Sequence, residues 1–181
     1  MTATDTRLPA GVALHELTSH RDERGSFTEL YRKAWATGVE PLQWNVVASE
    51  AGVLRGVHVH VRHADYLTVV RGRASVGLRD LRSRSQTAGC SALVELRAEA
   101  MTAIVIPPGV AHGFLFREPS THVYAVTHYW DLEDELGCHW ADPALGIPWP
   151  EPPAMLSERD SAAPSLDALL AELEPHQARL A

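Results

Sequence analysis

The sequence is short of lysine, cysteine and long apolar runs, and each shortage excludes a class of protein. Lys33 is the only lysine among 16 basic residues, so a Schiff base or P-loop phosphate site would depend on this one side chain. Two cysteines, Cys90 and Cys138, are too few for a disulfide framework or a four-cysteine zinc site, and they suit a reducing compartment. No segment approaches the roughly 18 apolar residues of a membrane span, and residues 1–11 contain no apolar signal core. We therefore expect a cytoplasmic protein without a membrane partner.

Basic residues are also outnumbered by acidic ones. The chain carries 23 acidic and 16 basic residues, a formal net charge of −7, which argues against a nucleic-acid partner. Its 181 residues are enough for one domain with a buried core, and a hydrophobic fraction of 45% is ordinary for a globular chain.

Short apolar runs separated by glycine and proline dominate the centre of the chain. No helix-length pattern lies between them, so they predict an antiparallel sandwich or barrel rather than a parallel α/β fold. The predicted strands cover residues 42–49, 53–60, 66–70, 74–81, 92–96, 103–106, 113–116 and 122–130.

The character of the sequence changes after Trp130. Residues 131–164 contain repeated prolines, and we expect an irregular segment that wraps the β-domain. Ser165 is a candidate N-cap for one amphipathic helix packed on the barrel. Its apolar stripe comprises Leu166, Leu169, Leu170 and Leu173.

Two histidine-containing segments are candidates for one pocket. His58 and His60 are two residues apart in a predicted strand, so both rings should leave the same face. Further along, a Pro-Gly turn in IPPGVAH places His112 at the start of the next predicted strand. If the sheet closes into a barrel, the inner faces of these strands meet. The spacing from His58 through Asp65 and Gly72 to His112 resembles the two cupin motifs, with aspartate in place of the usual glutamate.

Three other segments carry charged or aromatic patterns. Residues 22–29 alternate charged residues with an aromatic ring, and residues 156–160 form a charged piece after the proline-rich segment. In the predicted strand at residues 122–130, one face is unusually polar for a core strand. Its residues are Tyr124, His128 and Trp130.

Together these segments resemble the dTDP-4-dehydrorhamnose 3,5-epimerase family of deoxysugar biosynthesis. The matching stretches occur in the family's order within residues 20–160 and are DERGSFTE, QWNVVASEAGVLRGVH, GLRDLRSRSQTAG, IPPGVAHGF, YAVTHYW, WADPALGIPWP and LSERD. The resemblance implies an all-β cupin jelly-roll barrel with a short C-terminal helix, assembled as a homodimer. It divides the chain into a cupin domain at residues 1–164, with an N-terminal strand exchanged in the dimer, and a helix at residues 165–181.

The resemblance also implies a reaction and a catalytic set. In the family, a nucleotide-linked 4-keto-6-deoxy sugar loses a proton at C3, C5 or both to give an enolate, and regains it on the opposite face. His58 in RGVH matches the family's base, and Asp160 in LSERD matches the carboxylate that orients it. Tyr124 matches the family's acid, since a phenol keeps its proton at neutral pH. The expected substrate is a dTDP-linked sugar, and no cofactor is expected.

A larger set of residues matches the family's substrate-binding positions. It includes an RGxFxE segment that in the family reaches across the dimer to the nucleotide, a QxN pair, and an arginine whose planar fork suits phosphate oxygens. A pocket histidine and an aromatic residue complete it, although the aromatic residue is tryptophan where the family often has tyrosine. In this sequence they are Arg24, Phe27, Glu29, Gln43, Asn45, Arg55, His112 and Trp130.

Two positions depart from the family's pattern. His60 stands where the family usually has glutamine, and Asp65 where it has a lysine beside the 4-keto oxygen. A carboxylate there would repel a developing enolate oxygen, which suggests an altered substrate or epimerisation at a single carbon. One alternative is a metal-dependent cupin isomerase or oxygenase whose divalent ion is held by His58, His60, Asp65 and His112. A second alternative is a non-catalytic cupin that binds a sugar nucleotide.

Overall fold

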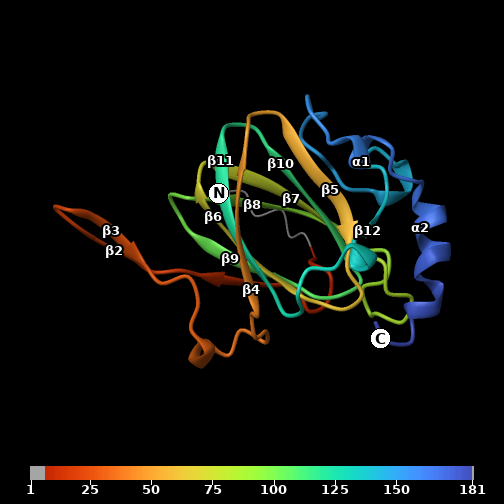
Figure 1. Ribbon diagram of the computed structural model, residues 1–181, viewed down its shortest axis with the longest axis horizontal. Coiled ribbons are helices and arrows are strands. Elements are labelled where there is room, and N and C mark those ends of the chain that lie inside the picture. Colours follow the sequence, from red (N-terminus) through yellow and green to blue (C-terminus); the bar gives the residue numbers. More distant parts are fainter. Residues whose placement is uncertain (1–6, 181) are drawn as a thin grey trace.

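Two five-stranded antiparallel sheets face each other and form the body of the protein (Figure 1). The computed structural model describes residues 7–180, so the segment considered for a signal core is described only from Arg7, and Ala181 of the predicted helical segment lies outside this range. The first sheet has the order β1 (Ala13–Glu16), β9 (Thr102–Ile106), β6 (Asp65–Arg71), β11 (Ser120–Val126) and β4 (Gln43–Ser49). The second has the order β12 (Leu136–Gly137), β5 (Val53–Val59), β10 (Val110–Phe116), β7 (Arg73–Asp80) and β8 (Ser91–Arg97). The predicted all-β jelly-roll class is confirmed.

The predicted strands are found with small shifts, and two of the shifts correct the sequence interpretation. β11 ends at Val126, which pairs with Gln43 and Asp65, the first residues of β4 and β6. Beyond it, Thr127 makes one backbone hydrogen bond to Ala64 at 3.2 Å, and residues 128–130 lie outside the strand. The prediction that His128 and Trp130 share a strand face with Tyr124 is therefore wrong. β10 begins at Val110, so His112 lies inside the strand rather than at its start.

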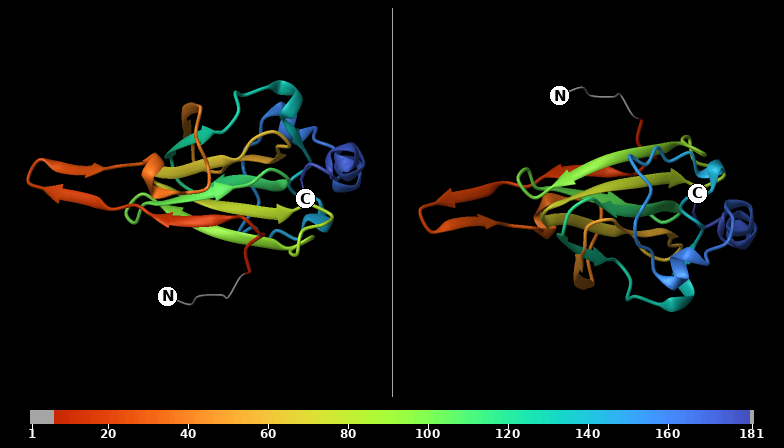
Figure 2. Two further views of the ribbon diagram at one scale, coloured as in Figure 1. Left: turned by 90° about the horizontal axis from the view of Figure 1, so that it is seen from below. Right: turned by 90° about the horizontal axis from the view of Figure 1, so that it is seen from above.

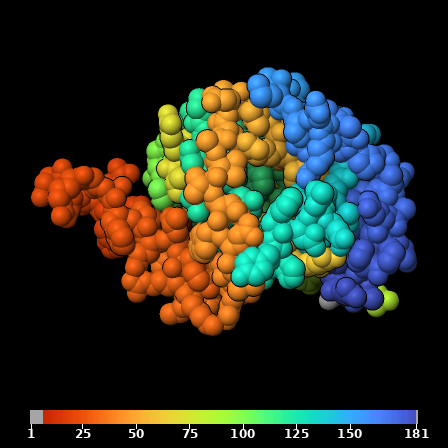
Figure 3. All heavy atoms as spheres, in the orientation of Figure 1, coloured from red at the N-terminus to blue at the C-terminus, as the bar shows by residue number. Residues whose placement is uncertain are grey.

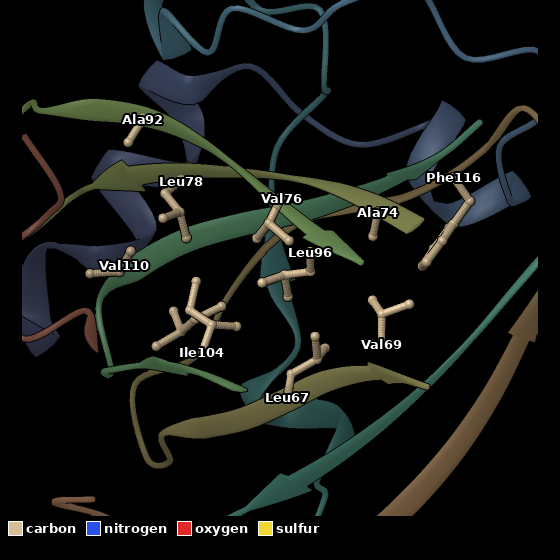
Figure 4. Close-up of a cluster of buried hydrophobic side chains, with 11 residues drawn as sticks. Leu67, Val69, Ala74, Val76, Leu78, Ala92, Leu96, Ile104, Val110 and Phe116 are labelled. Carbon is tan, nitrogen blue, oxygen red and sulfur yellow. The ribbon is translucent and has the colours of Figure 1, made fainter. Parts of the chain in front are cut away.

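The apolar core lies between the two sheets (Figure 4). Alternate residues of each strand point inward because successive side chains of a strand leave opposite faces. Leu67 and Val69 of β6 face Val76 and Leu78 of β7 across this layer, and all four side chains are at most 2% exposed. Phe116 closes one end of the cluster.

The second sheet is covered on its outer face by α2 (Leu166–Leu173), as predicted (Figure 1). Ser165 caps this helix, since its hydroxyl accepts a hydrogen bond from the backbone N–H of Ala168 at 3.3 Å. Leu166, Leu169 and Leu173 are buried in a cluster that includes residues of β5 and β10, whereas Leu170 is exposed, so the buried stripe is narrower than predicted. None of the helices within residues 7–180 is long and apolar enough to cross a membrane.

The segment predicted to be irregular contains one α-helical turn, α1 (Glu158–Ser161), two 3₁₀ turns and the short strand β12. One turn is too short to leave a periodic signal in a sequence. The remaining helical turns are 3₁₀ and span Lys33–Trp35, Leu132–Asp134, Pro143–Leu145 and Glu174–His176.

A hairpin of β2 (Ser19–Asp22) and β3 (Gly25–Thr28) extends away from the two sheets (Figure 2). Its strands pair only with each other, and Phe27 is 64% exposed. The segment is thus a projecting hairpin, not a strand of the main sheets.

β5 approaches β10 so closely at Gly56 that there is no room for a side chain at this position, and a Cβ on the facing Gly113 would be tight, 3.2 Å from the carbonyl oxygen of Arg55. Gly56 has a φ of 120°, which L residues rarely adopt, and a Cβ there would lie 2.7 Å from the Cα of Gly113. In the antiparallel register of these two strands, His58 of β5 lies opposite His112 of β10. These two glycines therefore set the distance between the two histidine-containing motifs.

A buried carboxylate holds the loop after β7. Asp80 is fully buried and accepts hydrogen bonds from the Arg82 guanidinium at 2.8 Å and from the hydroxyls of Ser85 and Thr87 at 2.6 Å. Burial alone would raise its pKa, but these donors outweigh burial and lower the pKa of Asp80 from 3.8 to about 2.

We predict that Asp80→Ala lowers the free energy of unfolding by about 3 kcal/mol at pH 7, because it leaves a largely buried guanidinium and two hydroxyls without their acceptor. A carboxyl pKa that is lower in the folded state contributes stability above pH 4, and this contribution disappears as the pH falls from about 4 to about 2. Urea unfolding at several pH values measures both effects. Glu118→Ala, which breaks the half-exposed pair with Arg73, should change stability by less than about 1 kcal/mol. Equal losses for the two variants would contradict the prediction.

We also predict that Gly56→Ala costs about 2–4 kcal/mol of folding stability, since it adds a backbone clash to an unfavourable φ. Gly25 in the hairpin is the matched control, with a φ of 135° and no heavy atom within 4 Å of the position that a Cβ would take. Gly25→Ala should cost only about 1 kcal/mol. The comparison is made by chemical denaturation, and a Gly56→Ala loss no larger than that of Gly25→Ala would show that the close approach is not constraining.

Candidate active site

A cavity of about 480 Å³ opens between the two sheets beside the apolar core. Figure 3 shows the hollow, framed by the strand β4 in orange, the segment after β11 in cyan and the segment around α1 in blue. The polar side chains that line it come from both sheets and from the segments that follow them. They include Arg55, His58, His112, Tyr124, Glu135 and Asp160.

His58 and Asp160 form a hydrogen-bonded pair at the wall of this cavity. The Nε2 atom of His58 lies 2.7 Å from Oδ1 of Asp160, and the two side chains are 22% and 7% exposed. The carboxylate accepts from Nε2–H, so this contact assigns the lone pair of the imidazole to Nδ1. Burial would raise the pKa of Asp160. Hydrogen bonds and nearby charge outweigh burial and lower this pKa below its usual range, and the largest of these effects is the hydrogen bond to His58. Asp160 thus stays ionised and orients the imidazole through Nε2–H.

The local structure explains why Asp160 reaches His58. Ser157 caps α1 by accepting a hydrogen bond from the backbone N–H of Asp160 at 3.0 Å, and this single turn contacts β5. The second carboxylate oxygen accepts a long hydrogen bond of 3.4 Å from the N–H of Gly56. The position of the carboxylate is therefore set by β5 itself.

Tyr124 lines the same cavity from β11, in the sheet opposite β5. Burial raises the pKa of its phenol, and the nearby carboxylates of Asp65 and Glu135 raise it further. The hydroxyl therefore keeps its proton at neutral pH and is available as a donor. The dyad and the phenol come from opposite walls of the cavity.

Arg55 and Trp130 also line the cavity, whereas Gln43 and Asn45 are outside its lining, and Gln43 contacts it through Trp130. The guanidinium of Arg55 is held by the Ser49 hydroxyl at 2.9 Å and the Ala48 carbonyl at 3.2 Å. Gln43 donates to Asn45 at 3.0 Å and accepts from the backbone N–H of Trp130 at 3.0 Å. The QxN pair thus fixes the chain at the start of the segment that follows β11.

His60, Asp65 and His112 form a separate buried cluster at the floor of the cavity. One ligand atom from each lies within 4.8 Å of the others, and all three side chains are at most 7% exposed. Burial raises the pKa of Asp65 to about 6 and lowers the pKa of His112 well below its usual range. This cluster contains three of the four residues of the metal set considered from the sequence. The fourth, His58, is not grouped with them, and its Nε2 bonds to Asp160.

The predicted nucleotide-binding residues of the N-terminal segment lie away from this cavity. Arg24 and Phe27 are on the projecting hairpin, and Arg24 pairs with Asp22 at 2.5 Å. Glu29 follows β3 and pairs with Arg32. Within one chain, the structure does not bring these residues to the dyad.

Several cavity residues were not identified from the sequence. His122 lies two residues before Tyr124 in β11, so the period of a strand could have placed it on the same face. Burial lowers its pKa to about 4, with a smaller effect of the charge of Arg55. Glu135 and Arg159 pair at 3.0 Å beside the dyad, and no periodic signal marks either residue.

Comparisons with known proteins agree with this geometry. The family model of dTDP-4-dehydrorhamnose 3,5-epimerase matches residues 6–168. A protein of this name from Pseudomonas aeruginosa is 37% identical over 172 residues, which cover 88% of this chain and 93% of that protein. The rmlC epimerase of Mycobacterium tuberculosis has a similar structure, with a TM-score of 0.85, 31% identity and 94% of each chain covered. ChmJ, a 3'-monoepimerase from Streptomyces bikiniensis solved with dTDP-quinovose, has a TM-score of 0.81 at 32% identity, covering 94% of this chain and 96% of that one. The chain belongs to the dTDP-4-dehydrorhamnose 3,5-epimerase family.

Proposed function

We propose that this epimerase inverts a carbon beside the keto group of a dTDP-linked 4-keto-6-deoxy sugar, with His58 as base and Tyr124 as acid. The observation that carries the proposal is the hydrogen bond of 2.7 Å between His58 and Asp160 at the wall of a cavity that Tyr124 lines from the opposite sheet. Inversion needs a base on one face of the sugar ring and an acid on the other. A ring bound between the two sheets meets both.

The proton transfers follow from the tautomer of His58. Its Nδ1 lone pair takes the proton from C3 or C5, and the electron pair of that C–H bond moves onto the 4-keto oxygen as an enolate. Asp160 stabilises the imidazolium that results, because the carboxylate accepts from Nε2–H. Tyr124 then gives its proton to the opposite face of the same carbon, while the enolate electrons return and re-form the 4-keto group. Exchange with solvent takes the proton from the His58 imidazolium and reprotonates the Tyr124 phenolate. No redox step is involved.

Arg55 is our candidate for the diphosphate. Its guanidinium lies at the cavity wall and is fixed by two hydrogen bonds to β4, so it is positioned before a ligand arrives. Similar proteins include both 3,5-epimerases and a 3'-monoepimerase. Trp130 has no hydroxyl where the family often supplies a second tyrosine, which favours reaction at one carbon.

We further propose a homodimer in which the hairpin β2–β3 completes the nucleotide site of the partner subunit. The hairpin projects from the body and carries Arg24 and an exposed Phe27. β4 is an edge strand whose outward residues Trp44 and Val46 are 44% and 71% exposed. An apolar edge of this kind is typical of a protein interface.

The remaining proposals concern organisation and location. We propose that residues 1–164 are the cupin domain and that residues 165–181 add the helical segment that packs on it. The unpaired cysteines Cys90 and Cys138 support a reducing, cytoplasmic location.

The proposed roles predict the effects of three substitutions on deuterium exchange at C3 and C5 of dTDP-4-keto-6-deoxyglucose in heavy water. His58→Asn should reduce exchange by at least about 1,000-fold, because no other group takes the proton. Asp160→Asn should lower the rate by about 100- to 10,000-fold, because the amide no longer stabilises the imidazolium. Tyr124→Phe should retain exchange at the centre where His58 acts but lose inversion.

The control is His139→Asn, which changes a histidine outside the cavity lining. NMR reports exchange and inversion separately, and tight binding of dTDP by each variant shows that the site is intact. Exchange at the wild-type rate in His58→Asn would remove His58 as the base.

The proposed dimer predicts that Val46→Asp shifts the protein to a monomer in sedimentation velocity, since a charge on this edge would be buried without a partner. Leu132→Asp is the matched control, because Leu132 is 68% exposed, like Val46, but lies outside β4. A wild-type monomer, or a Val46→Asp dimer as stable as that of Leu132→Asp, would contradict the proposed interface.

A further inference from the structure

The cluster of His60, Asp65 and His112 holds three potential ligand atoms that converge on one point. Nε2 of His60 lies 3.9 Å from Oδ2 of Asp65, and Nε2 of His112 lies 3.7 Å from the same oxygen. Both separations exceed the length of a hydrogen bond, which is about 2.7–3.2 Å. The three groups face one another in a buried space without bonding through these atoms.

Both imidazoles are oriented so that, in the neutral form, Nε2 carries the lone pair. Nδ1 of His60 lies 3.0 Å from the carbonyl oxygen of Asp134, and Nδ1 of His112 lies 3.1 Å from that of Val110. A carbonyl only accepts, so each Nδ1 must carry the proton. Metal-binding histidines are typically held in this way, with the distal N–H on a backbone carbonyl or carboxylate.

The supporting loop is itself anchored. The carboxylate of Asp134 is 1% exposed and accepts from the backbone N–H groups of Val61 and Arg62 at 2.8 and 3.1 Å. These hydrogen bonds hold Asp134 in place, and with it the backbone carbonyl that orients His60. His63 stacks on His60 with ring centroids 4.0 Å apart, and its Nε2 lies 3.9 Å from the other oxygen of Asp65.

We infer that His60, Asp65 and His112 bind a divalent transition-metal ion at the floor of the epimerase cavity. Two imidazoles and one carboxylate suit zinc, iron(II), manganese(II) or nickel(II) and leave further coordination positions open. Bond lengths of about 2.0–2.2 Å put neighbouring ligand atoms about 3.0–3.5 Å apart, so the two separations from Asp65 would each shorten by less than about 1 Å on metal binding.

The inference rests on the proposed function for its role in the reaction. The family resemblance implies that Asp65 stands where a lysine lies beside the 4-keto oxygen, and its carboxylate alone would oppose the negative charge that develops there. A divalent ion held by His60, Asp65 and His112 would supply positive charge at this place. His58 remains free to act as base, because Asp160 rather than the cluster engages it.

Metal binding can be measured without the reaction. The full chain is freed of metal by a chelator and titrated with Zn²⁺ by calorimetry and with Co²⁺ by visible absorption. We expect one ion per chain and a rise in the unfolding temperature with metal. Asp65→Asn and His60→Gln should each weaken Zn²⁺ binding by at least about 100-fold. His122→Asn, which changes a buried cavity histidine outside the cluster, should bind as the wild type does.

No saturable binding to the wild type would overturn the proposal, as would Zn²⁺ affinity unchanged in both Asp65→Asn and His60→Gln. Circular dichroism of the metal-free variants checks that each is folded.

The catalytic role has a separate test. His58→Asn should bind Zn²⁺ normally while losing deuterium exchange, whereas metal-free wild type should regain exchange when an ion is restored. Full exchange by the metal-free protein would overturn the role of the ion but leave the base assignment intact. Loss of exchange in every form, with normal metal binding, would instead contradict the proposed function.

Discussion

The close approach of β5 and β10 at Gly56 and Gly113 is the constraint on which the site depends. Because neither residue has a side chain, the two backbones come near enough for the register that pairs His58 with His112. The N–H of Gly56 also points at the carboxylate of Asp160. One steric requirement thus places the base, its orienting carboxylate and a buried histidine relative to one another.

The space between the sheets has two parts, an apolar core and a cavity lined by polar side chains. One part is filled by interdigitated aliphatic side chains and is insensitive to pH. The other contains imidazoles, carboxylates and a phenol, whose burial shifts pKa values in opposite directions for acids and bases. Polar groups buried in this way lower stability unless a hydrogen bond, an ion or a ligand compensates them. Such a cost is expected at a functional site rather than in a structural core.

The sequence predicted β4 to β11 because apolar runs separated by glycine or proline mark most of them, but it did not predict the short strands β1 and β12. The sequence does not show where a strand ends when that end is determined by its partner strands. It therefore places His128 and Trp130 in β11, whereas β4 and β6 begin opposite Val126. His58 and Asp160 were joined only by resemblance to a family, since no local pattern relates residues so far apart. The sequence also could not show which residues form the buried cluster of His60, Asp65 and His112. Strand period places His58 and His60 on one face, whereas the structure shows that one ring turns to Asp160 and the other to Asp65.

The contact between His58 and Asp160 spans 102 positions of the chain. Contacts between distant residues form late, because the entropy of closing a long loop must be offset before they stabilise anything. All strands of the two sheets precede α1 in the chain. The His58 imidazole therefore lacks its orienting carboxylate until the segment that contains α1 has been made.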